Sequence, residues 1–385
     1  MKTVKLLISI ILTAAMASCG SKQQTTDDII TVDVNANYPE KELILQDFMD
    51  VEYIPLETTD EFITQGVVKA IGKKHIIVIN WNNDGDIFIY DRSGKGIRKI
   101  NRKGQSGEEY SMITDIILDE DNNELFILNN ITKKILVYDL LGKFKRTFKF
   151  ADNSNYTNTF NYDQDNLITH KGYLPELETE QSRHIIISKN DGSITQEIEM
   201  PYETIQSTTI DFKDGRHVKP NNYLTLPFND DWVIYRTSSD TIYSHSRNHN
   251  TITPLLVRTP SIHSMNLQVF LFPTAITDRY YFMNIIKKEF NPEIAGGFPR
   301  TDLMYDKKGK KLFKYSLYNN DYTNKKEVHF FSKPENNEIA ICQFFNASDL
   351  VEAYENGELK GKLKEIAAEL DEESNSVIML VKHKK

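Results

Sequence analysis

The 385-residue sequence has only two cysteines, Cys19 and Cys342, so a framework of disulfide bonds cannot hold its fold together. Its N-terminal apolar run, Leu6–Met16, is too short to cross a bilayer, which takes about 20 residues. No block of lysine or arginine is long enough to follow a phosphate backbone, and the formal net charge is -9. These absences exclude a disulfide-stapled miniprotein and a multi-span membrane protein, and they argue against nucleic acid as a partner.

The first residues have the pattern of a processing signal. Two lysines precede the apolar run, and Met16-Ala17-Ser18-Cys19-Gly20 follows it. This ending resembles the lipobox of bacterial lipoproteins, whose cysteine is acylated and becomes the first residue. We therefore expect residues 1–18 to be a lipoprotein signal peptide, Cys19 to carry the lipid that anchors the protein to a membrane, and residues 19–30 to form a flexible tether. A plain secretory signal with an incidental cysteine is the alternative.

From Gly66 onward, short β-branched and aromatic runs alternate with Asn, Asp and Gly, which is typical of an all-β protein. One hairpin pattern recurs in Ile87–Lys95, Ile135–Lys143 and Leu303–Lys310. In each copy a strand ends in Tyr-Asp, and a glycine three residues beyond the Asp can supply the positive φ of the turn. Repeats of this kind, roughly 40 to 50 residues long with four strands each, indicate a β-propeller.

We predict a six-bladed β-propeller domain over residues 31–385, with blades at 66–101, 110–150, 157–200, 222–258, 268–318 and 328–383. The closing blade is expected to be composite, because Val328–Phe331, Ile339–Phe344 and Val377–Val381 supply only three strands. Glu52–Leu56 is the predicted fourth strand, and its proline suits the edge of a sheet. Apolar residues at helical spacing predict a short C-terminal helical insertion over about 346–373, which we expect to pack on the propeller rather than bind a partner.

Three segments carry a resemblance to a known family. They are Tyr53–Thr58, Gly104–Tyr110 and the Tyr-Asp-x-x-Gly-Lys hairpins. Together they resemble the six-bladed β-propeller lipoproteins of Bacteroides-type Gram-negative bacteria, over nearly all of the mature chain. The second segment departs from the family's Gly-Gln-Gly-Pro-Gly-Glu-Tyr at Ser106, Gly107 and Glu108. The resemblance implies an outer membrane lipoprotein that faces the periplasm or the cell surface, and it implies no activity, because the family has no established one.

Two loops imitate metal sites in the wrong surroundings. Asn80–Gly85, with Asp91 in the twelfth place, copies part of a calcium-binding EF-hand loop, but its flanks are typical of strands. His245 and His249 stand four apart, a spacing that brings two imidazoles to one metal only on a helix, whereas their flanks indicate strand and turn. We interpret both loops as turns between strands, and we expect no metal and no cofactor.

Residues suited to the mouth of a propeller channel are Glu109 and Tyr110, which enter the second blade, and His170 and Tyr173 in the third. Each could contact a ligand, and each also has an ordinary structural role as its alternative. Nucleophile-elbow, phosphate-binding and zinc-protease motifs are missing. We therefore predict a lipid-anchored, non-catalytic propeller that binds a glycan, a peptide or a partner protein at the cell envelope. The alternative is a metal-dependent hydrolase or lyase whose ligands come from several blades and meet in the central channel.

Overall fold

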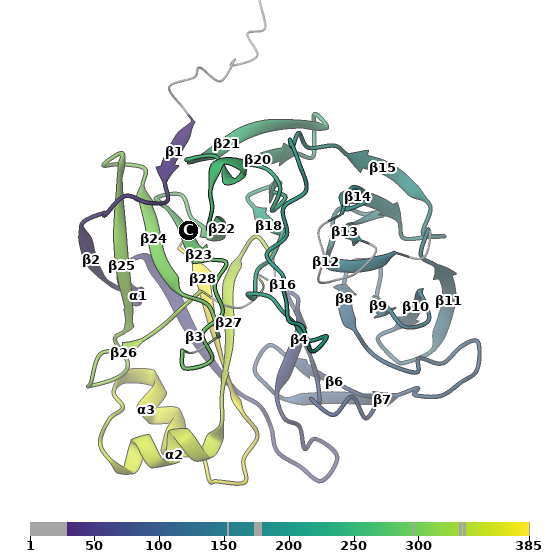
Figure 1. Cartoon of the computed structure of the whole chain (residues 1–385). Coiled ribbons are helices and arrows are strands. Elements are labelled where there is room, and N and C mark those ends of the chain that lie inside the picture. The colour runs from purple at the N-terminus through teal and green to yellow at the C-terminus, as the bar shows by residue number, and fades with distance from the viewer. Residues whose placement is uncertain are drawn as a thin grey trace, which may run out of the picture.

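The computed structural model describes residues 29–151, 154–172, 179–294, 296–330, 333 and 336–384. These residues form six sheets of three to six strands, arranged as blades in a ring, and one separate two-stranded sheet, which confirms the predicted propeller (Figure 1). The predicted signal peptide, Cys19 and the tether up to residue 28 lie outside the described residues. No helix in the described ranges is long and apolar enough to cross a membrane.

The first three blades each contain four antiparallel strands that follow one another in space as they do in sequence. These strands are β4 (Val67–Ile71), β5 (His75–Ile79), β6 (Asp86–Asp91) and β7 (Gly96–Asn101), then β8 (Asp115–Asp119), β9 (Glu124–Asn129), β10 (Lys134–Asp139) and β11 (Phe144–Lys149), then β12 (Asn155–Asn161), β13 (Asn166–Gly172), β14 (Arg183–Ser188) and β15 (Ile194–Ile198). Neighbouring blades cover both faces of the inner strands, so a strand such as β9 is buried along its whole length. That burial explains the continuous β-branched and aromatic runs of the sequence.

The fourth and fifth blades carry additional strands that the sequence analysis did not predict. Their own strands are β18 (Thr225–Phe228), β19 (Asp231–Ile234), β20 (Thr241–Ser246), β21 (Thr251–Thr259), β22 (Val269–Ile276), β23 (Tyr280–Lys287), β24 (Arg300–Asp306) and β25 (Lys311–Asn319). From the N-terminal side, β1 (Ile30–Asp33) adds to β21 and β2 (Glu40–Ile44) adds to β25, both in parallel. The short β26 (Lys326–Glu327) also pairs with β25. A hairpin of β16 (Ile210–Asp211) and β17 (His217–Val218) precedes the fourth blade, and the 3-10 helix Ile262–Ser264 follows it.

The closing blade is composite, as predicted. Its strands are β27 (Ile339–Phe345), β28 (Val377–His383) and β3 (Met49–Pro55), and β3 follows the short helix α1 (Leu45–Phe48). The strand expected at Val328–Phe331 was wrong as far as the structure describes it: residues 328–330 are not in a strand, and Phe331 lies outside the described residues. The reason is that the Val328 N–H donates to the carbonyl of Leu317 at 2.8 Å, so this segment joins the fifth blade instead.

The helical insertion consists of α2 (Ala347–Glu355) and α3 (Gly361–Ala367), which connect β27 to β28 in the chain (Figure 1). Its apolar side chains are buried in one cluster with Tyr53 of the closing blade and Phe282 of the fifth blade; they are Leu350, Leu363 and Ile366. The apolar stripe of the insertion therefore packs on the propeller, as expected.

The repeated Asp-x-x-Gly turn has the predicted form in its first two copies. The carboxylate of Asp91 accepts the N–H groups of Ser93 and Lys95, and Gly94 has a φ of 88°. Asp139 and Gly142 repeat this arrangement.

The third copy differs, because Lys310 rather than Gly309 takes the left-handed conformation, with a φ of 50°. The first two hairpins contain a register shift just before the turn, whereas the third pairs Asp306 with Lys311 in continuous register. Without the bulge, the residue that must reverse the chain is one position later.

Candidate functional site

Glu109 and Tyr110 lie in the loop between the first two blades and are held by contacts within it. The exposed Glu109 carboxylate accepts the N–H of Ser106 at 2.9 Å, and this hydrogen bond keeps its pKa below the usual range. Tyr110 is fully buried, its hydroxyl donates to the carbonyl of Gly85 at 2.7 Å, and burial raises its pKa to about 12. A direct ligand contact of Tyr110 would require this loop to move, and a binding role for either residue stays a prediction.

His170 is buried in β13 of the third blade, while Tyr173 lies outside the described residues. His170 of β13 is directly opposite His184 of β14, with ring centroids 5.1 Å apart. Burial, aided by the positive charge of Arg236, lowers the pKa of His170 well below 6.5 and that of His184 to about 3. Both imidazoles are therefore neutral near pH 7.

This pair predicts an acid-sensitive stability. Above pH 6.5 the two histidines are neutral in both the folded and the unfolded chain. As the pH falls, the unfolded chain binds protons first, so stability is lost below pH 6.5; for His184, whose folded pKa is about 3, the loss is about 2 kcal/mol at pH 5. Urea unfolding at pH 7 and pH 5 measures the loss. His184→Gln should reduce it and the exposed His249→Gln should not; equal curves for all three proteins would contradict the assignment.

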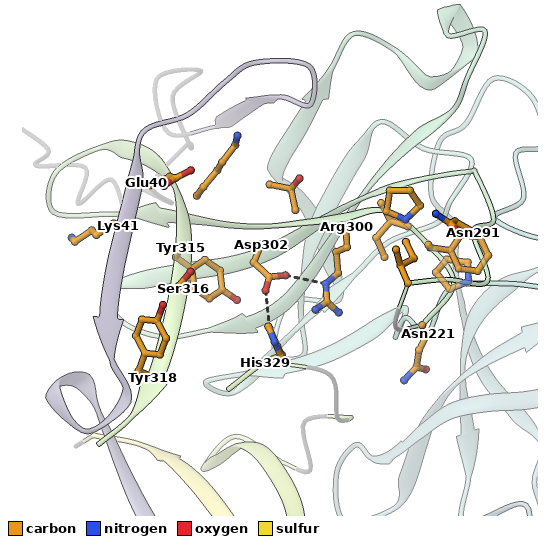
Figure 2. Close-up of a pocket in the computed structure, with 18 of the residues that line it drawn as sticks. Glu40, Lys41, Asn221, Asn291, Arg300, Asp302, Tyr315, Ser316, Tyr318 and His329 are labelled. Atoms are coloured by element: carbon orange, nitrogen blue, oxygen red, sulfur yellow. Dashed lines mark hydrogen bonds and ion pairs between the residues drawn. The ribbon is translucent and has the colours of Figure 1, made fainter. Parts of the chain in front are cut away.

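A large cavity lies on the fifth blade, and Glu109, Tyr110 and His170 are not among the residues that line it. It has a volume of about 1360 Å3 and is lined by residues of β2, β23, β24 and β25, by the loop 291–299, by residues 219–221 and by His329. Figure 2 shows Asp302 near its centre, with Arg300, His329 and Tyr315 around it. We call this cavity the blade-five pocket.

The pocket opens where two neighbouring strands separate. β24 pairs with β25 only from Leu303–Lys314 to Asp306–Lys311. Beyond that point β25 continues to Asn319, but the edge that had paired with β24 pairs with β26 instead. Residues 300–302 of β24 and 315–318 of β25 therefore diverge and line opposite walls.

Asp302 is the hub of a polar network at the base of the pocket. One carboxylate oxygen accepts Asn284 Nδ2 at 2.7 Å and Arg300 Nε at 3.1 Å. The other oxygen lies 3.1 Å from His329 Nδ1. Asn284 is the cross-strand partner of Asp302 on β23, and Arg300 lies two residues away on the same face of β24, so the sheet itself positions the network.

Tyr315 supplies a polar group that the described residues leave unsatisfied. Its side chain is 6% exposed, and its hydroxyl has no hydrogen-bond partner within the described part of the chain. Burial, together with the negative charge of Asp302, raises its pKa well above 10, so it remains a hydrogen-bond donor. A buried hydroxyl without a partner costs free energy, which a ligand group could recover if the side chains that cover the hydroxyl move aside.

The sequence did carry a signal for this site. In the repeated hairpin, the position four residues before the turn aspartate is Ile87 in the first copy and Ile135 in the second, both fully buried. In the third copy the same position is Asp302. A carboxylate that replaces a core isoleucine of a repeat marks a place where a blade has acquired another role.

A smaller cavity of about 340 Å3 lies at the channel mouth where the inner strands of the first three blades end. Lys333 reaches into it, 2.9 Å from the Thr159 carbonyl and 3.3 Å from the Asp115 carboxylate. No group of three or more His, Cys, Asp or Glu side chains that could hold a metal occurs among the described residues, in the channel or elsewhere.

Comparisons with known proteins agree with the fold. A family model described as "6-bladed beta-propeller" matches residues 20–343. A presumed exported protein of Bacteroides fragilis is 14% identical, with a TM-score of 0.57 over 93% of this chain and 99% of that one. A DUF4221-family protein of Bacteroides vulgatus is 9% identical, with a TM-score of 0.47 over 88% and 98% of the two chains. No protein with a curated description matches the sequence.

Proposed function

The chain belongs to the six-bladed β-propeller family DUF5128, whose model covers most of its length, and from this premise we propose an exported, lipid-anchored propeller that binds a glycan or a peptide without turnover. The blade-five pocket is the proposed binding site. Export is supported by the signal-like N-terminus, and the proposed location is the cell envelope, at the outer membrane.

The observation that carries the proposal is the unsatisfied Tyr315 hydroxyl beside the Asp302 network in a cavity of about 1360 Å3. Ligand pockets of this size commonly combine apolar surface with a few fixed polar groups. Tyr318 and Phe298 add aromatic surface, and Asn221 and Asn291 add amide groups to the lining. Aromatic rings with polar partners suit the flat faces of sugars and the backbone of peptides.

The test is a screen of glycans and peptides against the full chain carrying Cys19→Ala, with product analysis by mass spectrometry. For a ligand so found, Tyr315→Phe is expected to weaken binding by up to about tenfold, because one hydrogen bond is lost. The same change should leave the free energy of unfolding unchanged or slightly higher, since the hydroxyl has no hydrogen-bond partner among the described residues. Tyr354→Phe, on the surface of α2, is the matched control. Product formation that a chelator abolishes would overturn binding without turnover.

Anchoring is tested separately. Cys19→Ala is expected to leave the fold intact and to move the protein from the membrane fraction to the soluble fraction, because acyl chains alone would hold it there. Cell fractionation followed by immunoblotting measures the shift, with Cys342→Ala as the control. Retention of the Cys19→Ala protein in the membrane fraction would contradict the lipid anchor.

A further inference from the structure

Four large apolar side chains are exposed at the same end of the first two blades. The exposed large apolar residues in the described part of the chain are Ile63, Trp81, Ile97, Met112, Ile131, Leu141, Leu267, Ile294 and Tyr354. Ile63 and Met112 lie in the loops that lead into β4 and β8, and Trp81 and Ile131 lie in the loops after β5 and β9. In a four-stranded antiparallel blade, the loop into the first strand and the loop after the second strand share one end, so the four residues lie at the same end of the two blades.

Hydrogen bonds join these loops to one another. The Trp81 N–H donates to Gln65 Oε1 at 2.7 Å, which ties the Trp81 loop to the Ile63 loop. Asn83 Nδ2 donates to the carbonyl of Ile113 at 2.7 Å, which ties the same loop to the Met112 loop.

The Ile131 loop is tied to the Met112 loop in the same way, because Asn129 Nδ2 donates to Ser111 Oγ at 3.0 Å. At the other end, the ring of Trp81 makes an edge contact with Phe344 of β27, with 6.3 Å between centroids. We call Ile63, Trp81, Met112 and Ile131 together the apolar surface.

The loops that carry the apolar surface hold more acidic than basic side chains. Asp60, Glu61 and Glu108 are exposed in the two loops that carry Ile63 and Met112, and their carboxylates make no hydrogen bond or ion pair with the described residues. The basic side chains of the four loops, Arg102, Lys103 and Lys133, donate to neutral carbonyl or amide oxygens and so keep their positive charge. Acidic side chains outnumber them six to three in the loops 56–66, 80–85, 102–114 and 130–133, so the net charge of these loops is negative.

We propose that the apolar surface docks a protein segment that carries Lys or Arg beside aromatic or aliphatic side chains. Exposed apolar side chains that adjoin one another, rather than scatter, mark interaction sites. The uncompensated carboxylates select a basic partner, because like charges across an interface are costly. For the same reason they disfavour a second copy of this surface and an anionic lipid surface. This docking site is distinct from the blade-five pocket and does not depend on it.

The probe is an array of short synthetic peptides that carry two aromatic or aliphatic residues beside Lys or Arg, each matched by a peptide with Glu in place of the basic residues. The full chain with Cys19→Ala should bind members of the basic set and not their acidic counterparts. Trp81→Ala should weaken that binding by about tenfold or more, as the loss of an exposed aromatic anchor does. Glu61→Gln combined with Glu108→Gln should weaken it and reduce its dependence on salt.

Leu141→Ala is the matched control, because Leu141 is as exposed as Ile63 but lies in the turn between β10 and β11. All substituted side chains are exposed, so circular dichroism should show an unchanged fold. Equal binding of basic and acidic peptides, or an equal loss in Leu141→Ala, would overturn the proposal. So would self-association in sedimentation velocity, or binding to anionic vesicles, that Trp81→Ala abolishes.

Discussion

Deletion of residues 29–57 is expected to abolish cooperative folding, because it removes the outer strand of the blade that closes the ring. β3 forms an uninterrupted antiparallel ladder with β28, from Met49 opposite His383 to Pro55 opposite Val377. Met49, Tyr53 and Ile54 are buried in this blade, and burial of each such side chain contributes about 1.5 to 3 kcal/mol. Because whole domains are stable by only about 5 to 15 kcal/mol, the truncated chain should populate open forms with an exposed β28 edge, and such edges aggregate.

Thermal unfolding monitored by circular dichroism, with light scattering in parallel, measures this effect. Deletion of residues 29–44 is the matched control, since it removes β1 and β2 but keeps β3. That protein should be less stable than the full chain but should still unfold in one transition. A 29–57 deletion that is as soluble and heat-stable as the control would show that β3 is not needed for closure.

The fold was predictable because its signals are local and repeated. The Asp91 turn, with its glycine and the strand before it, recurs at the same place in the second blade, and each copy folds from its own residues. The composite closing blade was predictable from the number of strands in the sequence. The C-terminal segment supplied too few strands for a complete blade, so a strand from the N-terminal side was needed to close the ring. The prediction of a strand at Val328 was wrong because a hydrogen bond to Leu317 attaches this segment to the fifth blade. No local sequence pattern shows which of the two blades the segment joins.

The candidate site was not predictable in the same way, because its walls come from segments far apart in the chain. Asp302 and His329 meet across 27 residues, and Glu40 of β2 enters the same pocket only because an N-terminal strand adds to β25. The sequence did single out Glu109 and Tyr110, which are residue types common in binding sites, but Glu109 accepts from the backbone of its own loop and Tyr110 donates to the backbone of the loop between β5 and β6. In a repeat protein, the more informative signal is a departure from the repeat, as at Asp302.

Lys189→Met is expected to destabilise the protein by about 3 to 5 kcal/mol, the range observed when one partner of a buried ion pair is removed. Lys189 Nζ lies 2.6 Å from Asp119 Oδ2, and the two side chains are 5% and 2% exposed. Asp119 ends β8 of the second blade and Lys189 follows β14 of the third, so the ion pair joins the two blades, and the same ammonium group also donates to the carbonyls of Asp163 and Gln164. Without the lysine, the Asp119 carboxylate would remain buried beside two carbonyl oxygens that have lost a donor.

Chemical denaturation of the single and double variants separates the contribution of the ion pair to the free energy of unfolding from the contribution of packing around it. If the loss comes from an uncompensated charge, Lys189→Met combined with Asp119→Leu should be more stable than Lys189→Met alone, because neither charge is then left buried. Lys325→Met provides the surface control, since its ion pair with Glu42 is about two-thirds exposed on both sides and should contribute little. A double variant as unstable as the sum of its two single changes would show that Lys189 acts through its backbone contacts rather than through Asp119.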